Sequence, residues 1–431
     1  MSKPVVSIVK HDDTYKSVKE ALELCDGLKD FNKNDKILIK PNLVAWDFDL
    51  PYPPFGVVTT TAVMSALVKI LYEKGYTNLT IGEGSLAVTG SMTEKIYDVL
   101  GYEELQQKYG VKLVDLNKDK FEEVDLDGVK LSIARSALEA DKIINVPVLK
   151  THNQCKISLG IKNLKGCVDR KSKKKCHARD EELEHMFPRI VEKLPVALTL
   201  IDGIFALEKG PGHSGKAFRR DILVASKDIL ACDVVGAALL GYNAFDVEHL
   251  KFYARRNGGT LDLDSIETRG ESVADHAEFL DYSWEWTEDD TMPIGFKKRG
   301  FSGLAIRKYD SSLCTACSKT FNPVLILFQS AFKGEPFPNV EFISGKRQVA
   351  APGFDKTILF GHCAYQRNKD NPNINKAIVI KGCPPDLNEF QRLLKEEGIE
   401  CDYDNYIKYR HYIYNRYMDK KEFDMGLFVK Q

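Results

Sequence analysis

The chain has 431 residues, of which 43% are apolar and 10% aromatic, enough to build the buried cores of two or three domains. Its 61 basic residues nearly balance its 62 acidic residues, so no overall charge favours nucleic acid or an anionic membrane surface as a partner. The N-terminus lacks the pattern of a secretory signal, and no apolar run has the length of a membrane span, which predicts a cytoplasmic protein.

The first 245 residues repeat one pattern, in which a short β-branched run is followed by a polar turn and then by an amphipathic helix. Residues 4–10, 36–43 and 78–85 are such strands, and residues 60–75 are such a helix. Strands that alternate with helices of this length form parallel βαβ units. The pattern predicts an α/β domain over residues 1–245, with a mostly parallel sheet flanked by helices. Further strands are predicted at residues 111–117, 141–150, 195–204 and 220–226.

Polar side chains follow several of these strands at the point where each strand ends. Ligands of open α/β sheets bind at the carboxyl ends of the strands, so these side chains are predicted to converge at one edge. Turn chemistry alone explains many polar residues there, but it does not explain Lys40 and Lys150 at the ends of apolar strands. The two lysines predict a partly buried anion. The predicted substrate-binding residues at the strand ends are Lys40, Asn42, Glu83 and Ser85.

Residues 151–180 hold a concentration of lysines that two glycines interrupt. Lysine is a point charge suited to phosphate, sulfonate or carboxylate, and glycine lets backbone amides approach the same anion. Lys162, Asn163 and Lys165 follow an apolar run and are also predicted to bind the substrate. The lysines from 171 to 175 are interpreted as a solvated, mobile charge run.

Two histidines of this region are candidate general acids or bases, because imidazole titrates near neutral pH. We predict Lys150, His152 and His177 as the catalytic residues. A structural role for each histidine is an open alternative. The neighbouring Cys155 and Cys176 also leave open a second metal site.

The second half of the chain predicts a connector, a second domain and a tail. Residues 246–303 show little periodicity and are predicted to connect the domains. A new alternation of strands and helices predicts a smaller α/β domain over residues 304–400, including a helix over 323–332 with Pro323 near its start. Residues 401–431 space their tyrosines at helical intervals and are predicted to form a helical tail packed on the protein, in preference to a nucleic-acid stacking surface.

Four of the ten cysteines are spaced for one inorganic site. Cys314 and Cys317 form a Cys-x-x-Cys pair, and Cys363 and Cys383 each follow a predicted strand closely. Because adjacent parallel strands end at the same edge of a sheet, these two thiols are predicted to meet, with the pair completing four thiolates. The four cysteines are therefore the predicted cofactor-binding and metal-binding residues of the smaller domain.

Four cysteines suit either an iron-sulfur cluster or a zinc ion. Cys383 is followed by proline, as the last ligand of a cluster often is, and we predict a [4Fe-4S] cluster. Zinc and a core without metal are the alternatives. Dithiol catalysis by Cys314 and Cys317 is disfavoured, because residues 318–323 separate the pair from the predicted helix.

Several runs of the first domain carry a resemblance to a known family. They are ILIKPNLV, INVPVLKTH, SLGIKNLKGC with the His177 that follows, and LACDVVGAALLG. In this order they resemble the signature blocks of the family called domain of unknown function 362, over most of residues 1–270. Members are often described as iron-sulfur proteins, so the resemblance implies a cluster. This chain lacks the tandem ferredoxin-type cysteine runs of those members and has the dispersed set instead.

Together these features predict an iron-sulfur enzyme, of redox or Lewis-acid chemistry, that acts on a small anionic substrate at the sheet edge. A ferredoxin-like electron donor is an expected partner, whereas neither nucleic acid nor a membrane is expected. Two alternatives stay open. One is a non-enzymatic carrier of electrons or clusters, and the other is a zinc-stapled protein that binds a phosphorylated ligand.

Overall fold

A computed structural model describes residues 3–46, 53–86, 90–212 and 214–429 of the chain. The chain divides into two compact units, and both are α/β, as predicted. The predicted connector is divided between the units, whereas a short segment of the predicted first domain belongs to the second unit. The first unit comprises Met1–Lys175, Glu184–Ser283 and Tyr417–Gln431, and the second unit comprises Cys176–Leu183 and Trp284–Arg416.

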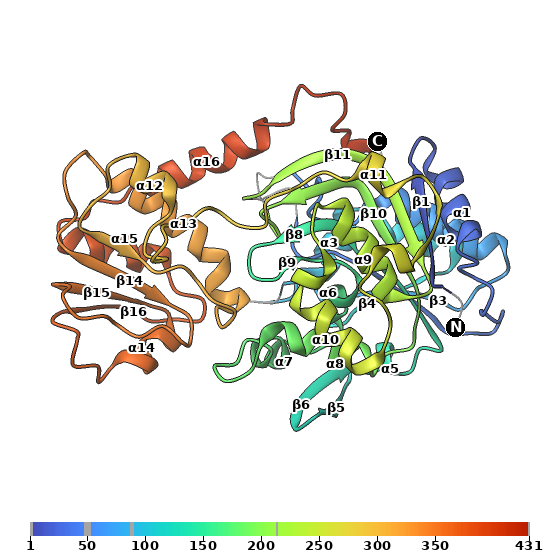
Figure 1. Ribbon diagram of the computed structural model, residues 1–431, viewed down its shortest axis with the longest axis horizontal. Helices are drawn as coiled ribbons and strands as arrows, with labels where there is room; N and C mark the ends of the chain where they lie inside the picture. The colour runs from blue at the N-terminus through green and yellow to red at the C-terminus, as the bar shows by residue number, and fades with distance from the viewer. Residues whose placement is uncertain (1–2, 47–52, 87–89, 213, 430–431) are drawn as a thin grey trace. The chain divides into compact units, whose positions relative to one another are not determined.

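The first unit is built on a large sheet (Figure 1). Its strand order is β12-β1-β11-β10-β7-β2-β3-β4. Neighbours from β10 to β4 are parallel, whereas β11 is antiparallel to both β1 and β10. The carboxyl ends of the parallel strands therefore share one edge. The strands are β1 (Val5–Lys10), β2 (Ile37–Pro41), β3 (Leu79–Glu83), β4 (Lys112–Asp115), β7 (Lys142–Val146), β8 (Val148–His152), β9 (Lys156–Ile157), β10 (Val196–Glu208), β11 (Lys216–Ser226) and β12 (Glu267–Gly270), with a separate hairpin of β5 (Phe121–Leu126) and β6 (Val129–Ala134).

The strand predicted over residues 141–150 is two strands. Pro147 has no amide hydrogen to donate to a neighbouring strand, and the pairing changes at this residue. Strand β7 pairs with β2 and β10, whereas β8 pairs with β10 and β9. The change in pairing places Lys150, the middle residue of β8, outside the regular ladder of β7.

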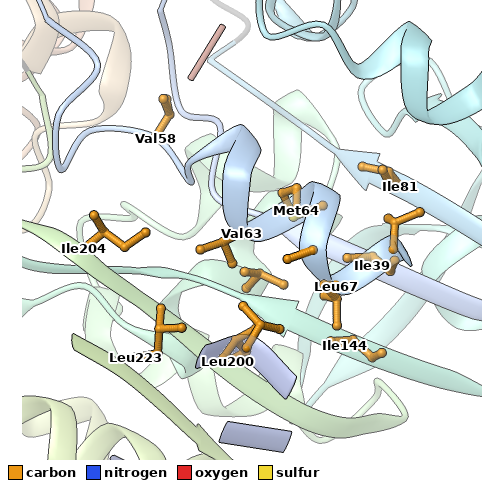
Figure 2. Packing of buried hydrophobic residues seen from close by; sticks show 14 of the residues in the cluster. Ile39, Val58, Val63, Met64, Leu67, Ile81, Ile144, Leu200, Ile204 and Leu223 are labelled. Carbon is orange, nitrogen blue, oxygen red and sulfur yellow. The ribbon is translucent and has the colours of Figure 1, made fainter. Parts of the chain in front are cut away.

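Helix α2 (Thr61–Glu73) covers one face of this sheet. The side chain of Thr60 caps the helix by accepting a hydrogen bond from the amide of Val63 at 3.3 Å. Met64 and Leu67 on the buried side of α2 pack with Ile39 and other apolar residues of the sheet, as Figure 2 shows. All of these side chains are fully buried, so this face forms the main core of the unit.

Helix α9 (Ile229–Leu239) covers the opposite face. Successive side chains of a strand alternate between faces, so Leu200 of β10 joins the core beside α2 while Ile201 meets α9. A Cβ atom on Gly236 of α9 would lie 3.0 Å from Cδ1 of Ile201, which shows how closely helix and sheet approach. Other helices of the unit are α1 (Thr14–Leu24), α3 (Thr93–Val99), α4 (Tyr102–Tyr109), α5 (Arg135–Leu138), α6 (Gly160–Asn163), η1 (Leu164–Cys167), α7 (Arg170–Lys175), α8 (Leu183–Val191), α10 (Glu248–Asn257) and α11 (Val273–His276).

The second unit has a four-stranded parallel sheet in sequential order, β13-β14-β15-β16. Its core is rich in phenylalanine: Phe328 on α13, Phe342 on β14, Phe360 on β15 and Phe390 on α15 are all fully buried. The elements are β13 (Leu304–Ile306), β14 (Val340–Ser344), β15 (Lys356–Phe360), β16 (Ala377–Ile380), α12 (Ile294–Lys298), α13 (Thr315–Ala331), α14 (His362–Asn368), α15 (Leu387–Glu396) and α16 (Tyr403–Asn415).

The helix predicted to begin at Pro323 begins eight residues earlier, at Thr315. Proline lacks the amide that bonds within a helix, so it usually marks a helix start, but here it lies within α13 and is buried in the core. The prediction that residues 318–323 separate Cys314 and Cys317 from this helix was therefore wrong. The reason given against dithiol catalysis falls with it. Cys314 is the N-cap residue of α13, and Cys317 lies in its first turn.

The last residues return to the first unit after α16. The hydroxyl of Tyr417 accepts a hydrogen bond from the amide of Ala217 at 2.7 Å. Phe428 is fully buried in the main core, where its ring packs against Phe55 and Phe205. None of the helices in the described ranges has both the length and the apolar character that a membrane crossing requires.

Candidate functional site

The ends of β2 and β3 carry a buried ion pair in the first unit. The Nζ atom of Lys40 lies 2.9 Å from Oε1 of Glu83, and both side chains are buried. Nζ of Lys40 also donates to the carbonyl of Pro41 at 2.7 Å. The second carboxylate oxygen of Glu83 accepts a hydrogen bond from the amide of Leu43 at 2.7 Å. Two predicted site residues therefore neutralise each other, so Glu83 anchors a lysine.

Lys150, in the middle of β8, is also fully buried, but its hydrogen-bond acceptors are uncharged. Its Nζ donates to Oδ1 of Asn42 at 2.6 Å and to the carbonyl of Val57 at 2.8 Å. Burial, with the positive charges of Lys162 and Lys40 adding to it, holds the pKa of Lys150 well below its ordinary value. The structure thus brings Lys150 and Asn42 into direct contact, although the strand predicted to end at Lys150 continues to His152.

A chain of side-chain amides extends from this contact into the sheet. Nδ2 of Asn42 donates to Oδ1 of Asn163 at 2.8 Å, and Nδ2 of Asn163 donates to Oδ1 of Asn145 at 2.8 Å. Nδ2 of Asn145 then donates to the carbonyl of Gly160 at 2.9 Å. Asn145 was absent from the predicted site, although an asparagine within the apolar strand β7 was a signal that could have indicated it.

Asp233 fixes the start of the basic segment. Its two carboxylate oxygens accept hydrogen bonds from the amides of Gly160 at 2.7 Å and Ile161 at 2.8 Å. Burial raises the pKa of Asp233 to about 7, against the two amides that lower it. Asp233 was also missed, although an aspartate inside the apolar helix α9 is rare enough to have indicated a structural partner.

Lys173 contradicts the interpretation of residues 171–175 as a solvated, mobile run. These residues lie in helix α7, and Nζ of Lys173 donates to the carbonyl of Gly84 at 2.7 Å and to Oδ1 of Asn117 at 2.8 Å. Burial lowers the pKa of Lys173 to about 8. Helix α7 therefore places Lys173 against the ends of β3 and β4. The run of lysines in the sequence gave no indication of this contact.

Two glycines let the backbone pass through this group. A Cβ atom on Gly166 would lie 2.7 Å from Cε of Lys40 and from Oε1 of Glu83. A Cβ atom on Gly84 would lie 2.3 Å from the carbonyl oxygen of Gly166 and 2.7 Å from Nζ of Lys173. Neither Gly84 nor Gly166 has room for a side chain, so the lysines lie against backbone atoms at these two positions.

Lys162 and Lys165 lie beside the ring of Phe187, with their Nζ atoms 5.7 and 6.0 Å from its centroid. Nζ of Lys162 donates to the hydroxyl of Ser158 at 3.3 Å. Burial lowers the pKa of Lys162 to about 8, with a smaller opposing effect from Cys155. Both lysines are half-buried, as is Lys173, so these three form the part of the group that is open to solvent.

The other predicted residues of this edge have more local partners. Nδ1 of the buried His152 accepts a hydrogen bond from the amide of Gln154 at 3.1 Å, so in the neutral ring the proton is on Nε2. The hydroxyl of Ser85 lies 2.8 Å from that of Thr93. His177 belongs to the second unit.

Sequence reasoning missed a buried carboxylate–imidazole pair near Lys162. Nδ1 of His249 lies 2.6 Å from Oε2 of Glu184, and the ring of His249 meets Phe187 edge-on. Among the described residues, Nε2 of His249 has no hydrogen-bond partner, although it is fully buried. Glu184 also acts electrostatically on Lys162. The spacing of Glu184 and His249 along the chain gave no signal of this pair.

In the second unit, Cys363 and Cys383 occupy equivalent places after neighbouring strands. Phe360, the last residue of β15, is paired with Ile380, the last residue of β16, and each cysteine comes three residues later. Gly361 and Gly382 precede them with positive φ angles of 95° and 130°. The register confirms that these two strands end side by side.

The Cys-x-x-Cys pair meets these thiols. Cys314, Cys363 and Cys383 all act electrostatically on Cys317, and burial together with them raises its pKa. A Cβ atom on Gly361 would lie 3.0 Å from Sγ of Cys317. Cys314 and Cys317 are buried, Cys363 is half-buried and Cys383 is exposed. The group of four is therefore buried on one side and open to solvent on the other.

His177 lies near this group within the second unit. Its Nδ1 is 2.8 Å from the carbonyl oxygen of Ser311, which makes Nδ1 the donor. Nζ of Lys346 donates to the backbone carbonyl of His177 and acts electrostatically on Cys317. The described contacts of His177 thus connect it to the segment that leads into Cys314.

Among the described residues, no three His, Cys, Asp or Glu side chains are arranged to hold a single metal ion. A tetrahedral zinc site would need sulfur atoms about 3.8 Å apart, from Zn–S bonds of about 2.3 Å. The donor set in the second unit, four thiols at the end of a parallel sheet, is the set that a [4Fe-4S] cluster takes. Four thiols are also the donor set of a structural zinc site, so the residue types admit either group.

The family pattern described as "Domain of unknown function (DUF362)" matches residues 37–238. The thylakoid-associated protein sll1697 of Synechocystis sp. is 30% identical over 226 residues, which are 51% of this chain and 67% of that protein. This chain belongs to the DUF362 family. The chain is also similar to a solved structure, the lactate racemase apoprotein from Thermoanaerobacterium thermosaccharolyticum. The match covers 56% of this chain and 57% of that one, with 17% sequence identity and a TM-score of 0.37.

The DUF362 match divides the two groups of residues. It covers the buried lysines at the strand ends, the basic segment and His177. The four cysteines lie outside it, since the first of them is Cys314. The buried lysines of the first unit therefore lie within the DUF362 pattern. The four cysteines lie in the sequence that follows it.

Proposed function

We propose that this protein is an iron-sulfur enzyme that binds a small anionic substrate among the lysines of the first unit and a [4Fe-4S] cluster at the four cysteines of the second. The observation that carries the proposal is the convergence of four thiols from three separate elements on one sheet edge. Cys314, Cys317, Cys363 and Cys383 would hold the cluster, which supplies single electrons when it is bound.

In the proposed enzyme, the first unit supplies binding and proton transfer. Lys40, Lys162 and Lys165 would hold the anion, with Asn42 and Asn163 orienting Lys150. Lys150 is the proposed proton donor or acceptor, because burial holds its pKa well below its ordinary value. His152 is a second candidate, with Nε2 as its reacting atom. A ferredoxin-like protein is the proposed electron donor, and a cytoplasmic location is proposed with it.

The second candidate function is a carrier of electrons or clusters without catalysis. It is favoured by the exposure of Cys383, because an exposed ligand brings a cluster near a partner protein.

Anaerobic purification of the full chain tests the proposal. We expect iron and inorganic sulfide in equal amounts and a broad visible absorbance that bleaches on reduction with dithionite. Colourless protein with stoichiometric zinc would contradict both the proposal of an iron-sulfur enzyme and the proposal of a carrier. Lys150→Ala then separates those two, since a carrier keeps its cluster and its reduction behaviour, whereas an enzyme keeps the cluster and loses turnover.

A further inference from the structure

The hydroxyl of Ser344, the last residue of β14, is buried without a described hydrogen-bond partner. Ser344 is 1% exposed, and none of the described residues offers its Oγ atom a hydrogen bond. Its backbone amide donates to Oε1 of Gln348 at 2.8 Å, so the end of the strand is held in place. A buried hydroxyl that lacks an acceptor destabilises a fold, so this hydroxyl needs another acceptor.

The side chain of Ser344 lies on the face of the sheet that packs with α13. Ser344 pairs with Phe360 of β15, which pairs with Ile380 of β16, so these three residues form the last row of the sheet. Paired residues point to the same face, and Phe360 and Ile380 belong to the core that is rich in phenylalanine. Cys317, in the first turn of α13, belongs to the same core. The hydroxyl is therefore the polar member of a row that shares its face with Cys317.

The residues that follow this row contact the segment that carries the Cys-x-x-Cys pair. A Cβ atom on Gly361, the residue after β15, would lie 3.0 Å from Sγ of Cys317. A Cβ atom on Gly345, the residue after Ser344, would lie 3.7 Å from the amide nitrogen of Leu313. Leu313 directly precedes the cysteine pair. The strand end that carries the unpaired hydroxyl thus lies against the cysteine group.

We propose that the hydroxyl of Ser344 donates a hydrogen bond to a sulfur atom of the bound [4Fe-4S] cluster and thereby raises the reduction potential of the cluster. The inference rests on the cluster of the proposed function and adds a residue that tunes it. The sulfur atoms carry more negative charge in the reduced cluster, so a donated hydrogen bond stabilises the reduced state more than the oxidised state. The hydroxyl keeps its proton, and the cluster gains one electron from the reductant.

Thr357 provides a matched control, because its hydroxyl is also fully buried and also lacks a partner among the described residues. Thr357 is the second residue of β15, so it lies toward the end of the strand opposite to Phe360. It shares its face with Leu359, which belongs to a separate apolar cluster. Removing the hydroxyl of Thr357 therefore tests the loss of a buried hydroxyl from this sheet away from the cysteines.

Potentiometric titration of the anaerobically purified full chain tests the inference. A mediator reduced by dithionite supplies the electron, and the visible absorbance reports the fraction of cluster that is reduced. At a fixed potential near the wild-type midpoint, Ser344→Ala should lower the ratio of reduced to oxidised cluster by about three- to tenfold, which is the effect of one net hydrogen bond. Thr357→Val should leave this ratio unchanged.

Two further variants of Ser344 separate the hydroxyl from the packing. Ser344→Thr and Ser344→Val have side chains of nearly the same shape, and only threonine keeps a hydroxyl. At the same fixed potential, Ser344→Thr should give the higher ratio of reduced to oxidised cluster. Should Ser344→Ala fail to hold a cluster, the iron content of this pair decides. Iron in Ser344→Thr alone supports the hydrogen bond, whereas iron in both variants or in neither overturns it.

The outcomes distinguish the inference from the proposed function. Equal ratios in the wild type and Ser344→Ala, with full iron content in both, would overturn the inference and leave the cluster in place. Equal decreases in Ser344→Ala and Thr357→Val would also overturn it, because the effect would then belong to the packing of the sheet. Wild-type protein without a cluster would overturn the proposed function, and the inference with it.

Discussion

Nδ2 of Asn163 donates to Oδ1 of Asn145 at 2.8 Å, which ties the basic segment to the middle of the sheet. Asn145 lies within β7, and Asn163 ends the short helix α6. A buried amide that is fully bonded on both sides has one orientation, so the bond fixes the position of the adjacent Lys162. The lysines are therefore held on a rigid part of the unit, and this arrangement makes several predictions.

The buried ion pair of Lys40 and Glu83 should be a major support of the first unit. Glu83→Gln leaves Lys40 buried without a negative partner and should lower the free energy of unfolding by about 3 to 5 kcal/mol. Glu94→Gln, which breaks the exposed pair with Lys118, is the control and should cost less than about 0.5 kcal/mol. Urea denaturation measures both, and equal losses would contradict a structural role for the buried pair.

Asp233 should position the anion site without contacting its ligand. Asp233→Asn replaces one acceptor of the amides of Gly160 and Ile161 by a donor, and it should weaken sulfate binding and cost about 1 to 3 kcal/mol of stability. Asp228→Asn changes the cap of the same helix and serves as the control. A positioning role is excluded if both variants bind sulfate as the wild type does.

The pair of His249 and Glu184 should stabilise the fold through Nδ1 of His249 and not through its Nε2. In His249→Asn the side-chain amide can still donate to Glu184 from the place of Nδ1, so most of the stability should be kept. His249→Ala removes this partner of Glu184, so it should lower the free energy of unfolding by about 2 kcal/mol more than His249→Asn does. Thermal and urea unfolding compare the two. If they prove equally destabilised, Nε2 carries an interaction of its own.

The four-cysteine group should be separable from the other cysteines of the second unit. Cys383→Ser removes the exposed ligand and should reduce the iron and sulfide content of anaerobically purified protein. Cys401→Ser is the control, because Cys401 is a half-buried cysteine that does not act on Cys317. Loss of iron in both variants, or in neither, would count against a cluster at these four residues.

The stability of the ligand-free protein should rise with pH above about 8. The pKa of Lys173 is lowered in the folded chain from 10.5 to about 8, so between these values the unfolded chain holds a proton that the folded chain has released. Raising the pH removes that advantage of the unfolded chain, so the free energy of unfolding increases. Urea denaturation between pH 8 and about 9.5 should show a steeper rise for the wild type than for Lys173→Met. A slope that is the same in both would contradict the lowered pKa.

Only part of the second unit could be predicted from the sequence. The βα alternation and the cysteines after β15 and β16 were evident, because strand residues alternate and parallel strands end at one edge. The start of α13 was not, because Pro323 was assumed to begin the helix that it lies within. Packing of the helix against the phenylalanine core outweighs one missing backbone bond.

In the first unit, the sequence by itself determined the α/β class and the polar strand end at Lys40 and Asn42, because both follow from local periodicity. The tertiary structure alone decided that Asp233 meets the amides of Gly160 and Ile161 and that Lys173 meets Gly84, and it placed His177 in the second unit. Those contacts join residues far apart in the chain, and their partners are chosen by burial and charge in the folded protein. Periodicity reports which face a residue occupies, whereas the packing of the elements decides what that face meets.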